Sequence, residues 1–175
     1  MKAYNYRRVK GVPYSRIEYI HGAPQPKIVK YTMGELSDSY THRVILLSRK
    51  RVQIRHNALE AARVAANRYL QKNLGKSFFL RILPLPHVVL RENKMIFGAH
   101  ADRLQEGMRR AFGKPVGRAA RVEPDQPIAE VYVDKSNIDV AKEALRRAGA
   151  KLPTPCRIVI EELERPSLEV KAAVS

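Results

Sequence analysis

Cysteine, paired histidines and long apolar runs are scarce in this chain of 175 residues. The single cysteine, Cys156, excludes an intrachain disulfide and a zinc cluster built on several cysteines. The five histidines are scattered, and no two have the i,i+4 spacing of a helical metal site. The longest apolar runs, such as residues 44–47, are far shorter than the ~20 residues of a membrane span. No apolar stretch typical of a secretory signal follows the N-terminus. We therefore expect no metal, no redox centre and no membrane span.

Acidic residues are also few, and they are unevenly distributed. The chain has 33 Lys and Arg against 17 Asp and Glu, a formal net charge of +16. Residues 1–122 hold 25 basic and 7 acidic residues, a net charge of +18, whereas residues 123–175 have a net charge of −2. An excess of this size in one part of the chain favours polyanion binding over a surface kept basic for solubility. Nucleic acid is the expected partner.

The sequence carries no recognisable catalytic or nucleotide-binding motif. Five residues separate Gly107 from Gly113, and Pro115 follows Lys114, so the spacing and hydroxyl of a phosphate-binding loop are missing. Asp102 and Glu106 have i,i+4 spacing, but the surrounding arginines favour ordinary salt bridges. We expect no enzymatic activity, no cofactor and no small-molecule substrate. The alternatives left open are a free RNA-binding protein and an RNA-modifying enzyme.

Hydrophobic periodicity predicts an α+β domain, in which an antiparallel or mixed sheet is covered on one side by two helices. Apolar residues at helical spacing predict helices over residues 58–74 and about 136–148. Capping boxes, Asn57 with Glu60 and Ser136 with Asp139, would open them. Strands are expected at residues 51–55, 78–83, 87–91, 128–133 and 157–163, within a core of residues 44–163. Pro84 and Pro86 form a rigid connector that fits an edge or corner of a sheet.

Three segments fall outside this regular pattern. Residues 1–43 are predicted to form an irregular basic arm of the same domain, with tyrosines among its basic residues. Residues 97–126 are predicted to form a long basic loop, which holds four of the nine glycines. Loops longer than about 12–15 residues are usually functional or disordered, and glycines allow close approach to a phosphate backbone. Residues 164–175 are assigned to an acidic C-terminal tail.

The loop also contains the most specific pattern in the chain. Residues 101–122, ADRLQEGMRRAFGKPVGRAARV, resemble a signature of the archaeal–eukaryotic "ten-e" family of large-subunit ribosomal proteins, relatives of bacterial large-subunit protein sixteen. Residues 54–63, 90–95, 143–148 and 151–153 match the same family, so the resemblance covers about residues 4–162. There are two departures. His100 stands where a glycine is expected, and the acidic residues 161–169 replace the basic extension of eukaryotic members, which favours an archaeal protein.

The resemblance implies an α/β-hammerhead-like fold and a structural, non-enzymatic role in the cytoplasmic ribosome. Members of the family bind large-subunit rRNA near the peptidyl transferase centre and the aminoacyl-tRNA site. Their partners are this rRNA, tRNA acceptor arms, which they help to position in translation, and neighbouring large-subunit proteins. The basic arm, the basic strand face and the residues carried over from the family give the expected RNA-binding set: Arg7, Arg8, Lys10, Arg16, Arg51, Arg55, Arg63, Arg91, Lys94, Arg103, Arg109, Arg110, Lys114, Arg118 and Arg121. The loop residues expected to reach toward the peptidyl transferase centre are Gly98, Gly107, Met108, Phe112, Gly113 and Gly117.

Overall fold

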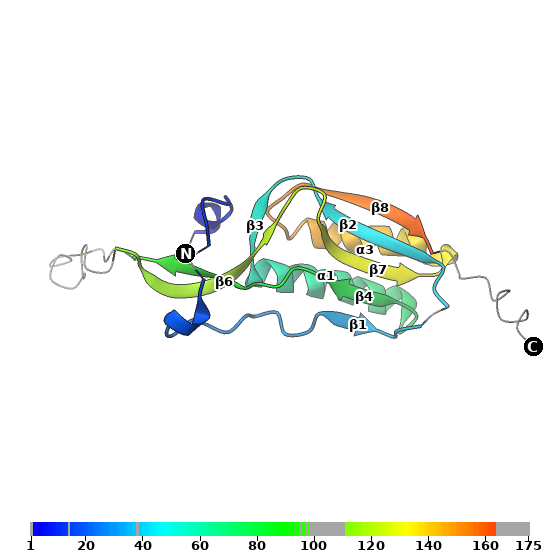
Figure 1. The fold of residues 1–175 in the computed structure, drawn as a ribbon. Coiled ribbons are helices and arrows are strands. Elements are labelled where there is room, and N and C mark those ends of the chain that lie inside the picture. Colours follow the sequence, from blue (N-terminus) through cyan, green and yellow to red (C-terminus); the bar gives the residue numbers. More distant parts are fainter. Residues whose placement is uncertain are drawn as a thin grey trace, which may run out of the picture.

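Two antiparallel sheets form the framework of the protein. The computed structural model describes residues 2–13, 15–37, 39–94, 96, 98 and 111–163. The larger sheet has the order β1 (Thr32–Gly34), β4 (Phe79–Ile82), β7 (Pro127–Val133), β2 (His42–Ser48) and β8 (Cys156–Glu162). The smaller sheet has the order β3 (Val52–Arg55), β6 (Lys114–Val122) and β5 (Val88–Glu92). The two sheets follow one another along an elongated molecule (Figure 1).

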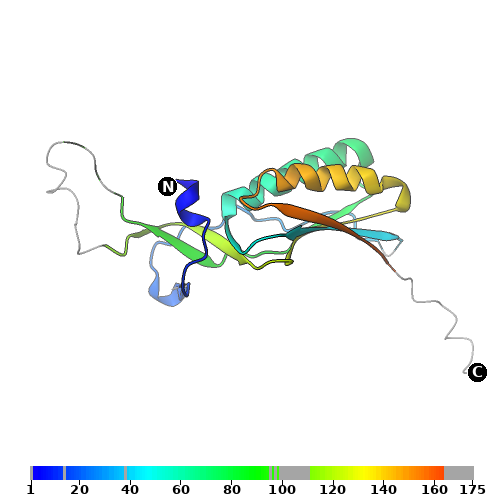
Figure 2. The same cartoon turned by 90° about the horizontal axis from the view of Figure 1, so that it is seen from above.

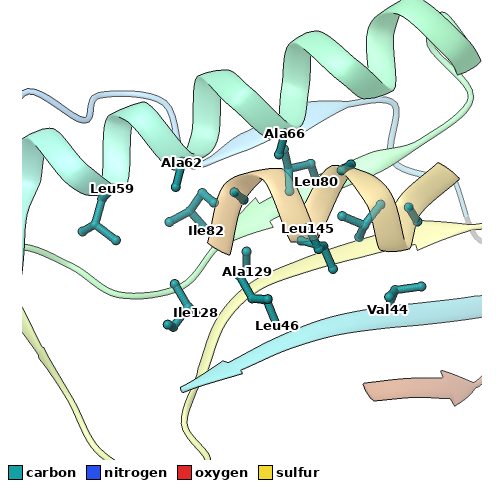
Figure 3. Close-up of a cluster of buried hydrophobic side chains, with 14 of the residues drawn as sticks. Val44, Leu46, Leu59, Ala62, Ala66, Leu80, Ile82, Ile128, Ala129 and Leu145 are labelled. Carbon is teal, nitrogen blue, oxygen red and sulfur yellow. The ribbon is translucent and has the colours of Figure 1, made fainter. Parts of the chain in front are cut away.

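Two helices, α1 (His56–Leu74) and α3 (Ile138–Gly149), lie side by side over one face of the five-stranded sheet (Figure 2). The apolar stripes expected from the sequence are the faces that become buried. The buried residues are Leu59, Ala62, Ala66 and Leu70 in α1 and Ala141, Ala144, Leu145 and Ala148 in α3. Ala144 was not among the positions expected, and Leu74 and Ile138, which were expected, are only half-buried. Figure 3 shows side chains of both helices pointing toward Leu46 and Ala129 of the sheet. Alanine on these stripes lets the helices approach the sheet closely, and the α+β prediction is confirmed.

The connector at Pro84 and Pro86 explains why there are two sheets instead of the single one expected. It joins β4 of the larger sheet to β5 of the smaller sheet. Proline provides no N–H for a ladder, so a continuous strand could not run through residues 83–87. The chain changes sheet again between β2 and β3 and between β6 and β7.

The prediction of a loop over the whole of residues 97–126 is wrong for residues 114–122. These residues form β6, the central strand of the smaller sheet, paired with β3 on one side and β5 on the other. Ala119, Ala120 and Val122 are buried in it. Pro115 and Gly117 are tolerated because the register shifts there: Leu90 faces Gly117 while Arg91 faces Pro115, as at a β-bulge. The part of the predicted loop at residues 99–110 lies outside the described residues, as does the predicted tail.

Neither predicted capping box forms. α1 begins at His56, with Arg55 at the N-cap position and no side-chain cap bond, so Asn57 lies inside the first turn and not at the N-cap. Glu60 accepts a hydrogen bond from Arg63 (Nε–Oε2, 2.9 Å). A short 3₁₀ turn (η4, Lys135–Asn137) precedes α3, and Asp139 pairs with Lys142 at 3.1 Å. Each carboxylate that was expected to accept a hydrogen bond from a backbone N–H instead pairs with a basic side chain three residues further along the helix.

None of the helices in the described part of the chain is both long enough and apolar enough to cross a bilayer.

Candidate nucleic-acid interface

The N-terminal arm is built onto both edges of the three-stranded sheet. On the β3 edge, the Gln53 N–H donates to the Arg7 carbonyl at 2.9 Å and the Gln53 side-chain amide donates to the Tyr6 carbonyl at 3.0 Å. On the β5 edge, the Val89 N–H donates to Ser15 Oγ at 3.0 Å. The Tyr6 hydroxyl donates to the Arg91 carbonyl at 3.2 Å. An arm of irregular backbone is thereby held in place, since it satisfies the open hydrogen-bonding groups of two edge strands.

Two arginines of β6 hold the arm from the middle of this sheet. The Arg121 guanidinium donates to the carbonyls of Gly11 (2.7 Å) and Lys10 (3.4 Å), and to Gln53 Oε1 (3.3 Å). Arg118 Nε donates to the Pro24 carbonyl at 2.9 Å. Both side chains are half-buried. Their first role in the structure is to position the arm, and their expected contact with RNA stays a prediction.

Replacing Arg121 with Ala should loosen the arm without unfolding the domain. The change removes the hydrogen bonds to Gly11, Lys10 and Gln53, each worth about 1 kcal/mol. In hydrogen exchange, the amides of Gln53 and Val89 should lose protection while those of α3 keep theirs. Arg68→Ala, on an exposed position of α1, is the control. Unchanged protection of Gln53 in the Arg121 variant would contradict this role.

Gly113 fixes the point where β5 and β6 come together. Its φ is +81°, in the left-handed region, and a Cβ there would lie 2.6 Å from the Glu92 carbonyl carbon and 2.7 Å from the Asn93 nitrogen. Only glycine fits both the dihedral angle and the close approach. Next to it, the Arg91 guanidinium lies over the Phe112 ring, 4.2 Å from the ring centroid. The end of the β5–β6 pair thus presents a cation stacked on an aromatic ring.

Gly113→Ala should therefore destabilise the protein more than a matched glycine substitution. Gly22 also has a positive φ, +73°, but a Cβ there would meet nothing within 4 Å. Gly22→Ala should cost only the dihedral strain, on the order of 1 kcal/mol, whereas Gly113→Ala adds a backbone collision. Urea unfolding of the two variants measures the difference. Equal losses of unfolding free energy in the two variants would mean that β5 and β6 move apart at Gly113 to accommodate a Cβ without cost.

Positive charge is concentrated at this end of the molecule. We define the basic end as residues 2–13, 15–31, 52–55, 88–94 and 111–122; it holds thirteen Lys and Arg against two acids, Glu18 and Glu92. Within the described residues, nine exposed basic side chains of this region form no ion pair with a carboxylate: Lys2, Arg7, Arg8, Lys10, Arg16, Lys27, Lys30, Lys94 and Lys114. Nine exposed cations without a carboxylate partner among the described residues form, on one end, a surface suited to a polyanion.

The local field also acts on His56, the first residue of α1. Its Nδ1 accepts a hydrogen bond from the Lys27 N–H at 3.2 Å. Burial lowers the pKa of His56, and the positive charges of Lys27, Arg55 and Arg118 lower it further. The imidazole is therefore kept neutral near physiological pH, as expected for a group surrounded by cations.

Outside the basic end, eight of the fifteen described Lys and Arg residues form ion pairs with carboxylates. Arg43 and Arg81 contact Glu130, Arg146 and Arg147 contact Glu143, and Arg157 contacts Asp125. Glu143 lies so close to its two arginines, 2.7 and 2.8 Å away, that their hydrogen bonds lower its pKa to about 2. The charge of α3 is thus compensated locally, unlike that of the basic end.

Ten of the expected RNA-binding residues are brought together at the basic end. They are Arg7, Arg8, Lys10, Arg16, Arg55, Arg91, Lys94, Lys114, Arg118 and Arg121. Arg51 and Arg63 lie outside it, and each already has a carboxylate partner, Glu123 at 2.9 Å and Glu60. Arg103, Gly107, Met108, Arg109 and Arg110 fall outside the described residues. Of the loop set, Gly98, Phe112 and Gly113 border that segment, and Gly117 lies within β6.

Gln53 and Lys27 belong to this region and were not expected from the sequence. Gln53 is buried and bridges β3 to the arm and to Arg121. The alternation of Gln53 with the apolar Val52 and Ile54 predicted only that Gln53 lies on the solvent-exposed face of a strand. It did not indicate that this side chain is buried under the arm. Nowhere in the described ranges do three His, Cys, Asp or Glu side chains cluster in a way that could hold a metal ion.

Comparison with known proteins identifies the family. Residues 8–159 match ribosomal protein L16p/L10e. Similar proteins include the large ribosomal subunit protein uL16 of Staphylothermus marinus, 56% identical over 94% of each chain. The uL16 of Hyperthermus butylicus is 54% identical over 98% of this chain and 96% of its own. The uL16 of Archaeoglobus fulgidus is 51% identical over 86% of this chain and 87% of its own.

These relatives are ribosomal proteins of archaea, not enzymes. The matched range includes both sheets, both helices and most of the N-terminal arm. With a family match over most of its length and relatives more than half identical, the chain belongs to the ribosomal protein L16p/L10e family.

Proposed function

We propose that this chain is a structural constituent of the large subunit of the cytoplasmic ribosome and that its basic end binds large-subunit rRNA. The observation that carries the proposal is the set of nine exposed cations without carboxylate partners among the described residues, placed on the N-terminal arm and at the end of the three-stranded sheet to which the arm is bonded. Membership of the family supports the ribosomal setting. Neighbouring large-subunit proteins would then contact the remaining surface.

The mechanism is phosphate neutralisation on a prepared surface. Each Lys or Arg that meets a phosphate releases condensed counterions, which supplies affinity at moderate salt. Gln53, Ser15 and Arg121 already hold the arm in place. Little conformational entropy is therefore lost when the basic residues of the arm bind RNA. Binding by such a preformed surface fixes the protein's orientation on the RNA more than it selects a sequence.

The segment between β5 and β6 would reach toward the peptidyl transferase centre and help to position the tRNA acceptor arm. This finer proposal rests on the family resemblance and on the cations at the base of the segment, Lys94 and Lys114, both exposed. Arg103, Arg109 and Arg110 of the same segment, with Met108 and Gly107, are its proposed contact residues.

Lys114→Ala and Arg109→Ala should therefore impair translation more than folding. The Lys114 side chain is exposed and has no ion pair within the described residues, so its loss should change the free energy of unfolding by less than about 0.5 kcal/mol. Thermal melting of the isolated proteins and aminoacyl-tRNA binding by reconstituted ribosomes measure the two effects. A large drop in melting temperature with normal tRNA binding would contradict the role.

Sedimentation tests the ribosomal assignment itself. Lysate is separated on a sucrose gradient, and the protein is quantified per large subunit before and after a moderate salt wash. We expect about one copy per large subunit, retained through the wash. Substoichiometric or easily removed protein would indicate a free RNA-binding or RNA-modifying protein instead.

A further inference from the structure

A hollow of about 670 Å³ lies between the arm and the end of β5. The arm contributes Val12, Arg16 and Tyr19, and the sheet side contributes His87, Arg91 and Phe112. Its volume is within the range of about 300–1,000 Å³ that is typical of ligand sites. The hydrogen bonds from Val89 to Ser15 and from Tyr6 to the Arg91 carbonyl hold the two walls together.

The lining combines aromatic rings with cations. Tyr19 and Phe112 are 72% and 66% exposed, so most of each ring is accessible, even though Arg91 lies over Phe112. Arg16 is exposed at the rim, and His87 is oriented by a hydrogen bond from Nδ1 to the Leu85 carbonyl at 3.1 Å. None of the described residues lining the hollow is acidic. A ligand with a flat apolar face and negative charge would complement this lining.

We propose that this hollow binds one unstacked nucleotide of single-stranded RNA, with the base on Tyr19 or Phe112 and the phosphate at Arg16 and Arg91. Base stacking on aromatic side chains and on guanidinium planes is the usual way in which proteins hold splayed-out RNA bases. Duplex RNA buries its bases in the stack and cannot offer such a face. The inference rests on the proposed function and adds to it a site for an unpaired nucleotide.

A binding experiment with the full chain separates stacking from charge. The probes are a fluorescent single-stranded hexauridylate and an RNA duplex long enough to stay base-paired, each measured by anisotropy at 0.15 M salt. Tyr19→Ala and Phe112→Ala are compared with Tyr4→Ala, an arm tyrosine that is 62% exposed and outside the hollow. Because all three side chains are exposed, the folds should persist, and thermal melting checks this.

We expect Tyr19→Ala or Phe112→Ala to bind the single strand at least about fivefold more weakly, the loss of one stacked base, and Tyr4→Ala to bind as the parent protein does. Duplex binding should be the same in all four proteins. Arg16→Gln should weaken both probes and lower the salt slope by about 0.7 to 0.9. A 4-thiouridine in the single strand should cross-link to the peptide holding Tyr19 or Phe112.

Single-strand affinity that is unchanged in both aromatic variants would overturn the inference and leave the proposed function intact. Equal losses on both probes would also overturn it, because the rings would then act only by holding the arm. If the parent protein binds neither probe and no rRNA, the proposed function fails as well. If the hollow instead binds an apolar segment of another protein, the aromatic variants should bind RNA as the parent protein does, and no 4-thiouridine cross-link should form.

Discussion

Replacing Arg7, Arg8, Lys10 and Lys114 together with Gln should weaken binding to purified large-subunit rRNA by on the order of 10³-fold at 0.15 M salt. All four side chains are exposed, and in the described residues none forms an ion pair with a carboxylate. Each phosphate contact contributes about 0.9 to the slope of log K against log salt, so that slope should fall by about 3 to 4. Filter binding across a salt series measures both quantities.

A second quadruple variant controls for net charge. It replaces four basic residues that are also exposed but lie outside the basic end, on α1, just after it, and in η4: Arg68, Lys72, Lys76 and Lys135. Changing these four to Gln removes the same charge and should reduce the affinity far less, with little change of slope. Equal losses in the two variants would mean that rRNA binding follows the total charge and not the basic end.

Glu130→Ala should lower the free energy of unfolding by about 3 kcal/mol. The carboxylate of Glu130 is 1% exposed and accepts a hydrogen bond from Arg43 Nε at 2.9 Å; Arg81 Nη1 lies 3.6 Å away. Burial lowers the pKa of the Arg43 guanidinium, but the hydrogen bond and charge of Glu130 raise it above its usual value. Removing Glu130 would leave a half-buried cation without its main partner.

Glu161→Ala is the matched control for this ion pair. Glu161 also contacts Arg43, at 3.4 Å, but its side chain is 49% exposed. An exposed pair of this kind contributes about 0 to 1 kcal/mol. Urea unfolding of both variants should show a clear difference, with rRNA affinity of the folded proteins unchanged. Similar losses would show that burial of Glu130 adds nothing to the pair.

The helices and most strands could be predicted because their apolar spacing alone specifies which face is buried. Leu59, Ala62 and Ala66 fall on one side of a helix whatever covers them. β6 could not be predicted, since Gly117, Pro115 and its arginines suggest a loop when read locally. Pairing with a strand on each side, which the local sequence does not reveal, determines its conformation. The start of α1 was also predicted wrongly, because the helix begins after Arg55, a residue that is not a typical N-cap.

For the interface, the sequence could predict the sign of the charge and the part of the chain that carries it. It could not separate arginines that face solvent from those that hold the arm. Arg121 reaches the carbonyl of Gly11, 110 residues away in the chain, and only the fold brings the two together. The ion pair of Arg43 with Glu130 joins residues 87 positions apart, so the local sequence could not predict it either.

RNA–protein cross-linking on purified large subunits shows whether the basic end is the surface that faces rRNA. After ultraviolet irradiation and digestion, cross-linked peptides are identified by mass spectrometry. We expect rRNA cross-links to concentrate in residues 2–31 and 114–121 and to be sparse on α3 and β8, whose cations are paired. Cross-links concentrated on α3 and β8, with none in the arm, would contradict it.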